Sequence, residues 1–280
     1  MQVEVLEPHG FCAGVTAALR KALALVRDGA ADTVYCLHEL VHNEIVVGDL
    51  TRRGFKFVES VADIPEGATA LFSAHGVSPA VRRAAAARRL KVVDATCPFV
   101  TRVHTAAREF AARGLPVVVI GHENHAEVKG IVGEVSDVAG HSPAITANSP
   151  TLSTDLGGSQ TIGVVSQTTM NADEVAALVA QLKERFTVET MAEVCNATKE
   201  RQDAVKAFDG DALLVLGSAN SSNTRRLMEV ARCRAFRAGT LDEVRALDLR
   251  GVRRLGVTSG ASTPESFLAE AVAYLKEDGK

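Results

Sequence analysis

The sequence predicts an α/β protein built from three similar units, and three observations support this fold class. Short runs of Val, Ile and Leu alternate with amphipathic stretches of helical period, which is typical of mostly parallel sheets covered by helices on both faces. The same order of helix, strand and polar loop occurs three times along the chain. Apolar residues make up 46% of the 280 residues, which is enough for one large core or several smaller ones.

Each repeat begins with a helix that opens at a cysteine and continues with two strands, each followed by a polar loop. The first helices are expected at 9–23, 94–111 and 192–208. The strands that follow them are expected at 32–37, 115–121 and 211–217, and their polar loops at 38–44, 122–130 and 218–226. The second strand, second loop and closing helix are expected within 70–86, 162–182 and 253–272.

The repeats predict three domains of small size, at 12–96, 97–194 and 195–280. The third repeat ends in a helix with no strand after it, whereas a spare strand, MQVEVL, precedes the first repeat. We therefore expect residues 1–11 to complete the third domain by adding a strand to its sheet. This would close the three pseudo-equivalent domains into a ring and bring their equivalent loops to one centre.

Composition and charge exclude several classes of protein. The net charge of -3 argues against a nucleic-acid partner. No apolar run approaches the ~20 residues of a membrane helix, and the first residues lack the features of a signal peptide. We therefore expect a cytoplasmic protein that does not bind membranes. Five widely scattered cysteines argue against a disulfide framework in that compartment.

Three of the five cysteines, Cys12, Cys97 and Cys195, occupy equivalent positions at the starts of helices. Simple burial is the alternative for any free cysteine, and it suits Cys36 inside a strand and Cys233 at the end of a helix. Repetition at three equivalent places argues against simple burial for the other three. A helix N-terminus also favours the thiolate, which is the form that binds metal.

Three thiolates can hold zinc or an iron–sulfur cluster. Structural zinc usually takes closely spaced cysteine pairs, and the sequence contains no C-x-x-C. A [4Fe-4S] cluster accepts ligands from distant parts of a fold, and three ligands would leave one iron open to act as a Lewis acid. The sequence favours a central iron–sulfur site, and a zinc hydrolase remains an alternative.

The polar loops carry neutral donors, with Lys and Arg nearly absent from their tips. Several loops run directly into helices, so backbone N–H groups at helix N-termini add to the side-chain donors. This combination suits a phosphate or diphosphate. Helix capping is the alternative for each Ser, Thr or Asn, and an ordinary loop position is the alternative for each His and for Glu127. The candidate residues are His42, His75, His125, Glu127, Thr168, Ser221, Ser222, Asn223 and Ser262.

The motifs together resemble those of the 4-hydroxy-3-methylbut-2-enyl diphosphate reductases of the non-mevalonate isoprenoid pathway. They span nearly the whole chain in the family's order: GFCAGV, LVHNE, FSAHGVS, DATCPFVTRVH, GHENHAEVKG, SQTT, VCNATKERQ, GSANSSNTRRL and TSGASTP. The resemblance implies a three-domain fold around a [4Fe-4S] cluster that is ligated by Cys12, Cys97 and Cys195.

The resemblance also implies a role for each polar loop. Glu127 would deliver protons, and Thr168 would lie near the substrate hydroxyl. The substrate diphosphate would be held by His42, His75, His125, Ser221, Ser222, Asn223 and Ser262. The implied reaction is reductive dehydroxylation of an allylic diphosphate to isopentenyl and dimethylallyl diphosphate. The sequence contains no nicotinamide or flavin motif, so we expect the electrons to come from a ferredoxin or flavodoxin. We also expect the protein to be a monomer.

Two positions depart from the family pattern, and one rival function stays open. Ala126 stands where the family usually has proline between His and Glu, and His9 stands where arginine is common. Loss of the proline removes a constraint on the loop that bears Glu127. A non-catalytic sensor that binds an iron–sulfur cluster or a diphosphate is the alternative function, but it would not need Glu127 or Thr168.

Overall fold

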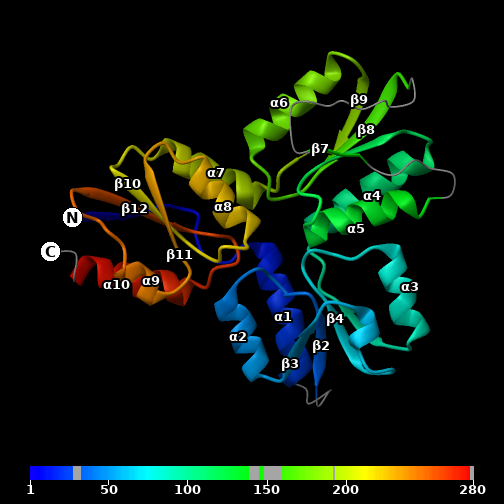
Figure 1. Ribbon diagram of the computed structural model, residues 1–280, viewed down its shortest axis with the longest axis horizontal. Helices are drawn as coiled ribbons and strands as arrows, with labels where there is room; N and C mark the ends of the chain where they lie inside the picture. Colours follow the sequence, from blue (N-terminus) through cyan, green and yellow to red (C-terminus); the bar gives the residue numbers. More distant parts are fainter. Residues whose placement is uncertain (28–32, 139–144, 148–158, 192, 278–280) are drawn as a thin grey trace. The chain divides into compact units, whose positions relative to one another are not determined.

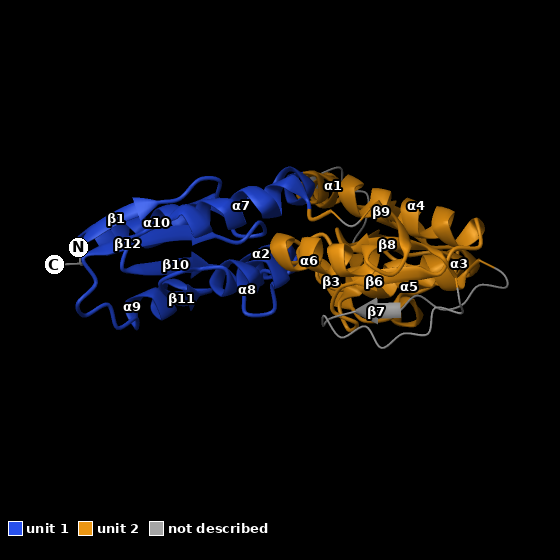
Figure 2. Ribbon diagram, turned by 90° about the horizontal axis from the view of Figure 1, so that it is seen from above, with its two compact units in different colours: residues 1–16, 41–52, 195–280 blue, residues 17–40, 53–194 orange. Residues whose placement is uncertain are grey.

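The computed structural model describes residues 1–27, 33–138, 145–147, 159–191 and 193–277. Within these ranges it contains three separate four-stranded sheets whose paired strands are all parallel (Figure 1). The predicted α/β class with small parallel sheets is therefore confirmed. The chain divides into two compact units, which Figure 2 colours separately. Unit 1 comprises Met1–Thr16, Val41–Arg52 and Cys195–Lys280, and unit 2 comprises Ala17–Leu40 and Arg53–Val194.

Unit 1 contains one sheet in the order β1-β12-β10-β11. Its strands are β1 (Gln2–Val5), β10 (Ala212–Leu216), β11 (Arg234–Ala238) and β12 (Arg254–Ser259). Its helices are α2 (Glu44–Arg52), α7 (Asn196–Ala207), α8 (Ser222–Glu229), α9 (Leu241–Arg245) and α10 (Glu265–Glu277). The N-terminal strand pairs with β12 in register from Gln2 with Arg254 to Val5 with Val257, so the spare strand does complete this sheet.

Both faces of this sheet are buried, which explains why its central strand is written as a continuous apolar run. Leu214 and Leu216 of β10 pack with α9 and α10, and Leu213 and Val215 pack with α7 and α8. All five residues of β10 are 0% exposed. Successive residues of a strand face opposite sides, so an uninterrupted Leu/Val sequence is what two covered faces require.

Unit 2 contains the other two sheets, in the orders β3-β2-β4-β5 and β7-β6-β8-β9. The first is formed by β2 (Val34–Leu37), β3 (Phe55–Val58), β4 (Thr69–Phe72) and β5 (Lys91–Asp94), with η1 (Val61–Asp63) and α3 (Pro79–Ala87). The second is formed by β6 (Val117–Ile120), β7 (Ile145–Ala147), β8 (Thr161–Ser166) and β9 (Thr187–Met191). Its helices are α4 (Pro98–Ala112), α5 (Ala126–Ser136) and α6 (Ala172–Lys183). Helix α1 (Ala13–Arg27) begins in unit 1 and continues into unit 2.

The strands of each sheet fall within one predicted repeat, apart from β1, which joins the third. The domain boundaries 12–96, 97–194 and 195–280 stay a prediction, because the sheets of the first two repeats lie in one compact unit. Helix α2 belongs to the first repeat by sequence, yet its Ile45 packs in the core of unit 1. The sequence repeat and the compact units therefore divide the chain differently.

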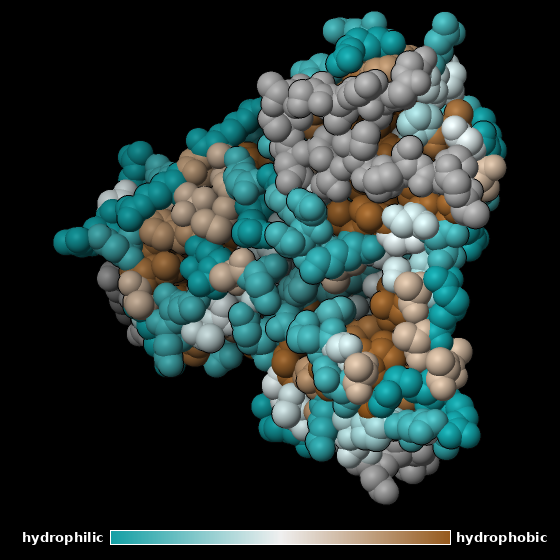
Figure 3. All heavy atoms as spheres, turned by 45° about the vertical axis from the view of Figure 1, so that its right-hand side comes forward, coloured by the Kyte–Doolittle hydropathy of each residue, from teal (hydrophilic) through white to brown (hydrophobic). Residues whose placement is uncertain are grey.

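The surface is mostly hydrophilic on the face that Figure 3 shows, with apolar side chains in smaller patches. Met1 and Val92 are the only large apolar residues that are highly exposed in the described ranges, at 39% each. Within those ranges, no helix combines the length and the apolar character needed to cross a bilayer.

Candidate functional site

Two of the three candidate cysteines lie at helix starts in unit 1. Cys12 directly precedes α1, and the backbone N–H of Val15 points to its sulfur with N and Sγ 3.5 Å apart. Cys195 is the N-cap residue of α7, and its Sγ lies 3.2 Å from the Thr198 hydroxyl. Hydrogen bonds to sulfur and the positive end of a helix both stabilise a thiolate. Each sulfur therefore has the surroundings of a metal ligand.

The third candidate, Cys97, is the N-cap residue of α4 in unit 2. Its backbone N–H donates to the carbonyl of Ala74 at 3.0 Å, which ties it to the residue before His75. Pro98 follows as the first residue of the helix, where a missing N–H has no cost. Cys97 thus repeats the local geometry of Cys12 and Cys195.

The remaining cysteines have different surroundings. Cys36 lies in β2 at 0% exposure, and burial raises the pKa of its thiol to about 12. Cys233 lies just before β11 and packs against an apolar cluster in unit 1. It follows α8, which ends at Glu229, and therefore does not lie at a helix end as the sequence suggested. Both cysteines are consistent with a purely structural role.

The donor loops of unit 1 follow the carboxyl ends of β10 and β12, the edge at which parallel sheets bind ligands. Ser221 caps α8 by accepting a hydrogen bond from the N–H of Thr224 at 3.3 Å, and Ser222 and Asn223 form the first turn of α8. Asn223 is 4% exposed, and neither amide atom of its side chain has a hydrogen-bond partner within the described residues. A buried amide without partners has a large desolvation cost, which a bound ligand would offset.

The loop with His42 is fixed to the loop after β12 within the same unit. The Ser262 hydroxyl donates to the carbonyl of His42 at 3.0 Å. Asn43 caps α2 through its side-chain oxygen, which accepts from the N–H groups of Ile45 and Val46 at 3.1 Å each. Glu44 accepts a hydrogen bond from the hydroxyl of Ser218 at 2.6 Å, which connects the start of α2 to the loop after β10. Hydrogen bonds therefore link three of the predicted loops.

In unit 2 the structure brings His75, His125, Glu127 and Thr168 together. The rings of His75 and His125 meet edge to face with centroids 5.4 Å apart. His125 is the N-cap residue of α5, and its Nδ1 accepts from the N–H of Glu127 at 3.2 Å. The N–H of Thr168 donates to one carboxylate oxygen of Glu127 at 2.7 Å, and the Thr168 hydroxyl donates to the other at 3.1 Å. Two paired histidine rings are thus linked through His125 to the segment that carries a doubly hydrogen-bonded acid.

Glu127 is 2% exposed, and burial raises the pKa of its carboxyl to about 7. The two hydrogen bonds from Thr168 favour the carboxylate and limit this rise. A carboxyl group that titrates near neutral pH can both hold and release a proton under cellular conditions. The geometry therefore suits a general acid.

The loop around Glu127 is well fixed without the usual proline. Ala126 is the first residue of α5, a position at which proline fits without loss of a hydrogen bond. The contacts of Glu127 with His125 and Thr168 hold this turn in place of the ring constraint. The other departure, His9, lies between Glu7 and Glu265 of unit 1, with ring-nitrogen to carboxylate distances of 3.0 Å to each.

Sequence reasoning missed a buried pair in unit 2. His104 on α4 and Glu134 on α5 are each 5% exposed, and their Nδ1 and Oε1 atoms are 3.2 Å apart. His104 packs against Gly76 and Gly130, where an added Cβ would lie 3.1 Å and 2.7 Å from its Cε1. The His104 ring therefore lies between Gly130 of α5 and Gly76, the residue after His75. It lies within the motif DATCPFVTRVH, but its partner is 30 residues away, so spacing gives no indication of the pair.

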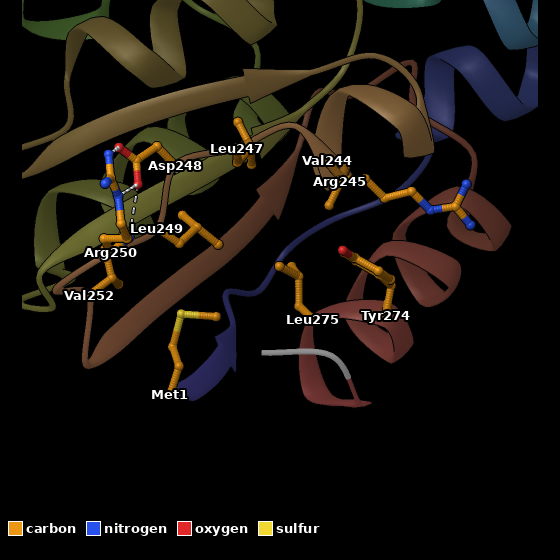
Figure 4. A pocket seen from close by; sticks show the side chains of 10 residues that line it. All are labelled: Met1, Val244, Arg245, Leu247, Asp248, Leu249, Arg250, Val252, Tyr274 and Leu275. Atoms are coloured by element: carbon orange, nitrogen blue, oxygen red, sulfur yellow. Dashed lines mark hydrogen bonds and ion pairs between the residues drawn. The ribbon is translucent and has the colours of Figure 1, made fainter. Parts of the chain in front are cut away.

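A cavity of about 440 Å³ lies in unit 1 at the opposite edge of the sheet from the donor loops (Figure 4). Met1, Leu249 and Val252 line it where β1 and β12 begin, and Tyr274 and Leu275 of α10 close one side. Its Arg250 and Asp248 pair with each other at 2.7 Å. None of the candidate residues line this cavity, so it is separate from the site.

Fold and site together define an α/β protein whose sheets present cysteines, neutral donors and a buried acid at their carboxyl ends. The chain belongs to the LytB protein family, which it matches over residues 3–276. The resemblance drawn from the motifs is thereby confirmed.

Relatives of known name and structure match along almost the whole chain. The chain is 43% identical over 284 residues to the 4-hydroxy-3-methylbut-2-enyl diphosphate reductase of Azoarcus sp. (strain BH72), covering 98% of this chain and 89% of that protein. It is 42% identical over 288 residues to the enzyme of the same name from Rhodococcus jostii (strain RHA1), covering 99% and 84%. The solved E-1-hydroxy-2-methyl-but-2-enyl-4-diphosphate reductase of Plasmodium falciparum superposes with a TM-score of 0.88 at 30% identity, covering 99% and 88%.

The titration of Glu127 is testable by infrared difference spectroscopy, with Glu127→Gln as the reference. We expect its carboxyl band to disappear with a midpoint near pH 7, well above the ordinary value of 4.5. Thr168→Val should move the midpoint higher, because it removes a hydrogen bond that favours the carboxylate. A wild-type midpoint at the ordinary value would show that burial does not control this group.

The same shift has a consequence for stability, and its sign follows from linkage. The folded state holds the Glu127 proton more tightly than the unfolded chain does. The contribution of Glu127 to the free energy of unfolding is therefore complete below pH 4.5 and is lost as the pH rises through about 7. The urea midpoint of the wild type should therefore fall relative to that of Glu127→Gln between about pH 5 and about pH 8. A constant difference over that range would contradict the shift.

Gly130→Ala tests the close approach at His104. The new Cβ would lie 2.7 Å from His104 Cε1, so we expect destabilisation of about 1–3 kcal/mol and a lower thermal midpoint. Gly48→Ala in α2 is the matched control, because its Cβ would meet only the end of Arg52 at 3.6 Å. That control should gain about 0.5–1 kcal/mol, as alanine favours a helix interior. Equal midpoints for the two variants would refute the steric argument.

Proposed function

We propose that this chain is a 4-hydroxy-3-methylbut-2-enyl diphosphate reductase, which converts its substrate to isopentenyl and dimethylallyl diphosphate. The observation that carries the proposal is the buried Glu127 carboxyl on Thr168, next to the paired rings of His75 and His125. The named relatives match over almost the whole chain and support the same activity. The reaction replaces a C–O bond by a C–H bond, consumes two electrons and two protons, and releases water.

We assign Cys12, Cys97 and Cys195 as the ligands of a [4Fe-4S] cluster. Their fit rests on donor chemistry: each thiol lies at a helix start, and the sulfurs of Cys12 and Cys195 lie near polar hydrogens. When bound, the cluster supplies single electrons and one iron without a protein ligand, which can act as a Lewis acid. Cys36 and Cys233 are not part of this assignment.

The substrate diphosphate is held by neutral donors. We assign this role to His42, His75, His125, Ser221, Ser222, Asn223 and Ser262, together with the N–H groups at the start of α8. The buried amide of Asn223, which has no partner in the described part of the chain, supports this assignment. Holding the diphosphate end orients the hydroxyl end and reduces the entropic cost of reaction.

Glu127 provides the proton for the leaving hydroxyl group. With a pKa of about 7, the carboxyl is partly protonated at neutral pH and can donate to the departing oxygen, which leaves as water. Thr168 fixes the orientation of the carboxyl through two hydrogen bonds and lies within reach of the substrate hydroxyl in this assignment. Electrons come from a ferredoxin or flavodoxin, and we place the enzyme in the cytoplasm as a monomer.

Metal analysis tests the cysteine assignment. Cys12→Ser, Cys97→Ser and Cys195→Ser should each lose most of the iron and acid-labile sulfide of anaerobically prepared protein, because each removes a ligand. Cys233→Ser is the control and should keep both, since its thiol packs against apolar side chains of unit 1. Full cluster content in any of the three ligand variants would remove that cysteine from the assignment.

Turnover of the diphosphate substrate with an artificial electron donor tests Glu127. Glu127→Gln should keep the cluster and bind substrate but lose at least 100-fold in kcat, a typical contribution of general acid catalysis of about 10²–10⁴. Glu123→Gln is the matched control, because Glu123 is exposed in the same loop. Wild-type kcat in Glu127→Gln would exclude the carboxyl from the proton path.

A further inference from the structure

Arg201 on α7 is a buried cation without an acidic partner among the described residues. It is 2% exposed, and no carboxylate in the described part of the chain lies within ion-pair distance of it. All its hydrogen bonds go to backbone carbonyls: Nη1 donates to Ala197 at 2.8 Å, and Nη2 donates to Gly10 at 2.8 Å and His9 at 3.3 Å. Its Nε is buried with no partner among the described residues.

These contacts connect the two cysteine segments of unit 1. Gly10 lies two residues before Cys12, and Ala197 lies two residues after Cys195. One guanidinium therefore bridges the turn that leads to the first thiol and the helix turn that follows the second. A planar group with five donors can hold two such segments in a fixed geometry, which an ammonium cannot do as well.

Burial of an unbalanced guanidinium is costly, so its charge needs compensation. Desolvation lowers the pKa of Arg201, and the groups that oppose this most strongly are Cys12 and Cys195, ahead of Glu200 and Glu7. The two sulfurs become negative when they ligate metal. The strongest compensation available to Arg201 is thus negative charge at the two cysteines.

We propose that Arg201 is a positioning residue that balances the negative charge of the cysteine-bound cluster and raises its reduction potential. The inference rests on the proposed function, since it concerns the cluster assigned above. Reduction adds one electron to a centre already surrounded by thiolates. The reduced form carries one more negative charge, so a buried positive charge stabilises it more than the oxidised form, and weak screening in the interior makes this effect large. The effect acts on the electron-accepting step and leaves the proton supply of Glu127 unchanged.

The midpoint potential of the cluster tests this role directly. In Arg201→Met, we expect the one-electron reduction equilibrium constant to fall at least tenfold, which corresponds to a midpoint about 59 mV more negative. Arg201→Lys keeps the charge and should retain a midpoint close to the wild type. Lys199→Met is the matched control, because it removes an exposed positive charge from the same helix and should leave the midpoint unchanged. The measurement is a redox titration followed by electron paramagnetic resonance.

Each outcome decides the proposal. A fully loaded Arg201→Met protein with an unchanged midpoint would overturn it while leaving the proposed function intact. If Arg201→Met loads no iron but Arg201→Lys does, the requirement for a positive charge is supported. If Arg201→Lys also fails to load iron, the planar guanidinium with its several donors is needed and not the charge alone. The charge-balancing role would then be wrong. A wild type without iron and sulfide would overturn both this inference and the proposed function.

Discussion

Every chemical group of the candidate site depends on the parallel pairing of short buried strands. Parallel strands share one carboxyl edge, and the helices that follow start at that edge with unsatisfied N–H groups. The sequence uses this edge repeatedly: His75 follows β4, His125 follows β6, Thr168 follows β8, and Ser221 follows β10. Because each of these loops begins where its strand ends, its first residues lie at the carboxyl edge. The regular core therefore determines which residues can meet a ligand.

Burial is also the cause of the unusual chemistry of individual side chains. In water Glu127 would be an ordinary carboxylate, but at 2% exposure its pKa reaches about 7. The buried side chains of Asn223 and Arg201 follow the same pattern: among the described residues, both amide atoms of Asn223 and the Nε of Arg201 lack a hydrogen-bond partner. Such groups lower the stability of the folded protein. Their presence in both units is explained if bound groups supply the missing interactions.

The sequence predicts the two central strands of each sheet, and the physical reasons are local; the outer strands β3, β7, β9 and β11 lie outside the predicted strands. Alternation of apolar runs with helical patterns gives the strands and helices, and the threefold order identifies Cys12, Cys97 and Cys195 as equivalent. Tertiary contacts decide the rest. Nothing near Ile45 in the sequence indicates that α2 packs with unit 1, and the His104–Glu134 pair joins helices 30 residues apart. Arg201 is missed because Arg is usually exposed on a helix, and only its distant carbonyl partners show that it is buried.

The distribution of charge separates binding from chemistry in the proposed reaction. The diphosphate end is the same in substrate and products, so strong cationic contacts there would hold all of them equally and would not accelerate the reaction. The donors assigned to that end are His, Ser and Asn side chains, whereas the buried cation Arg201 lies with the cysteine segments. Glu127 and Thr168, which we assign to the hydroxyl end, are the groups that can distinguish substrate from product. In this arrangement, the contacts that differ between substrate and product lie at the C–O bond that breaks. There they lower the activation barrier and do not slow the release of product.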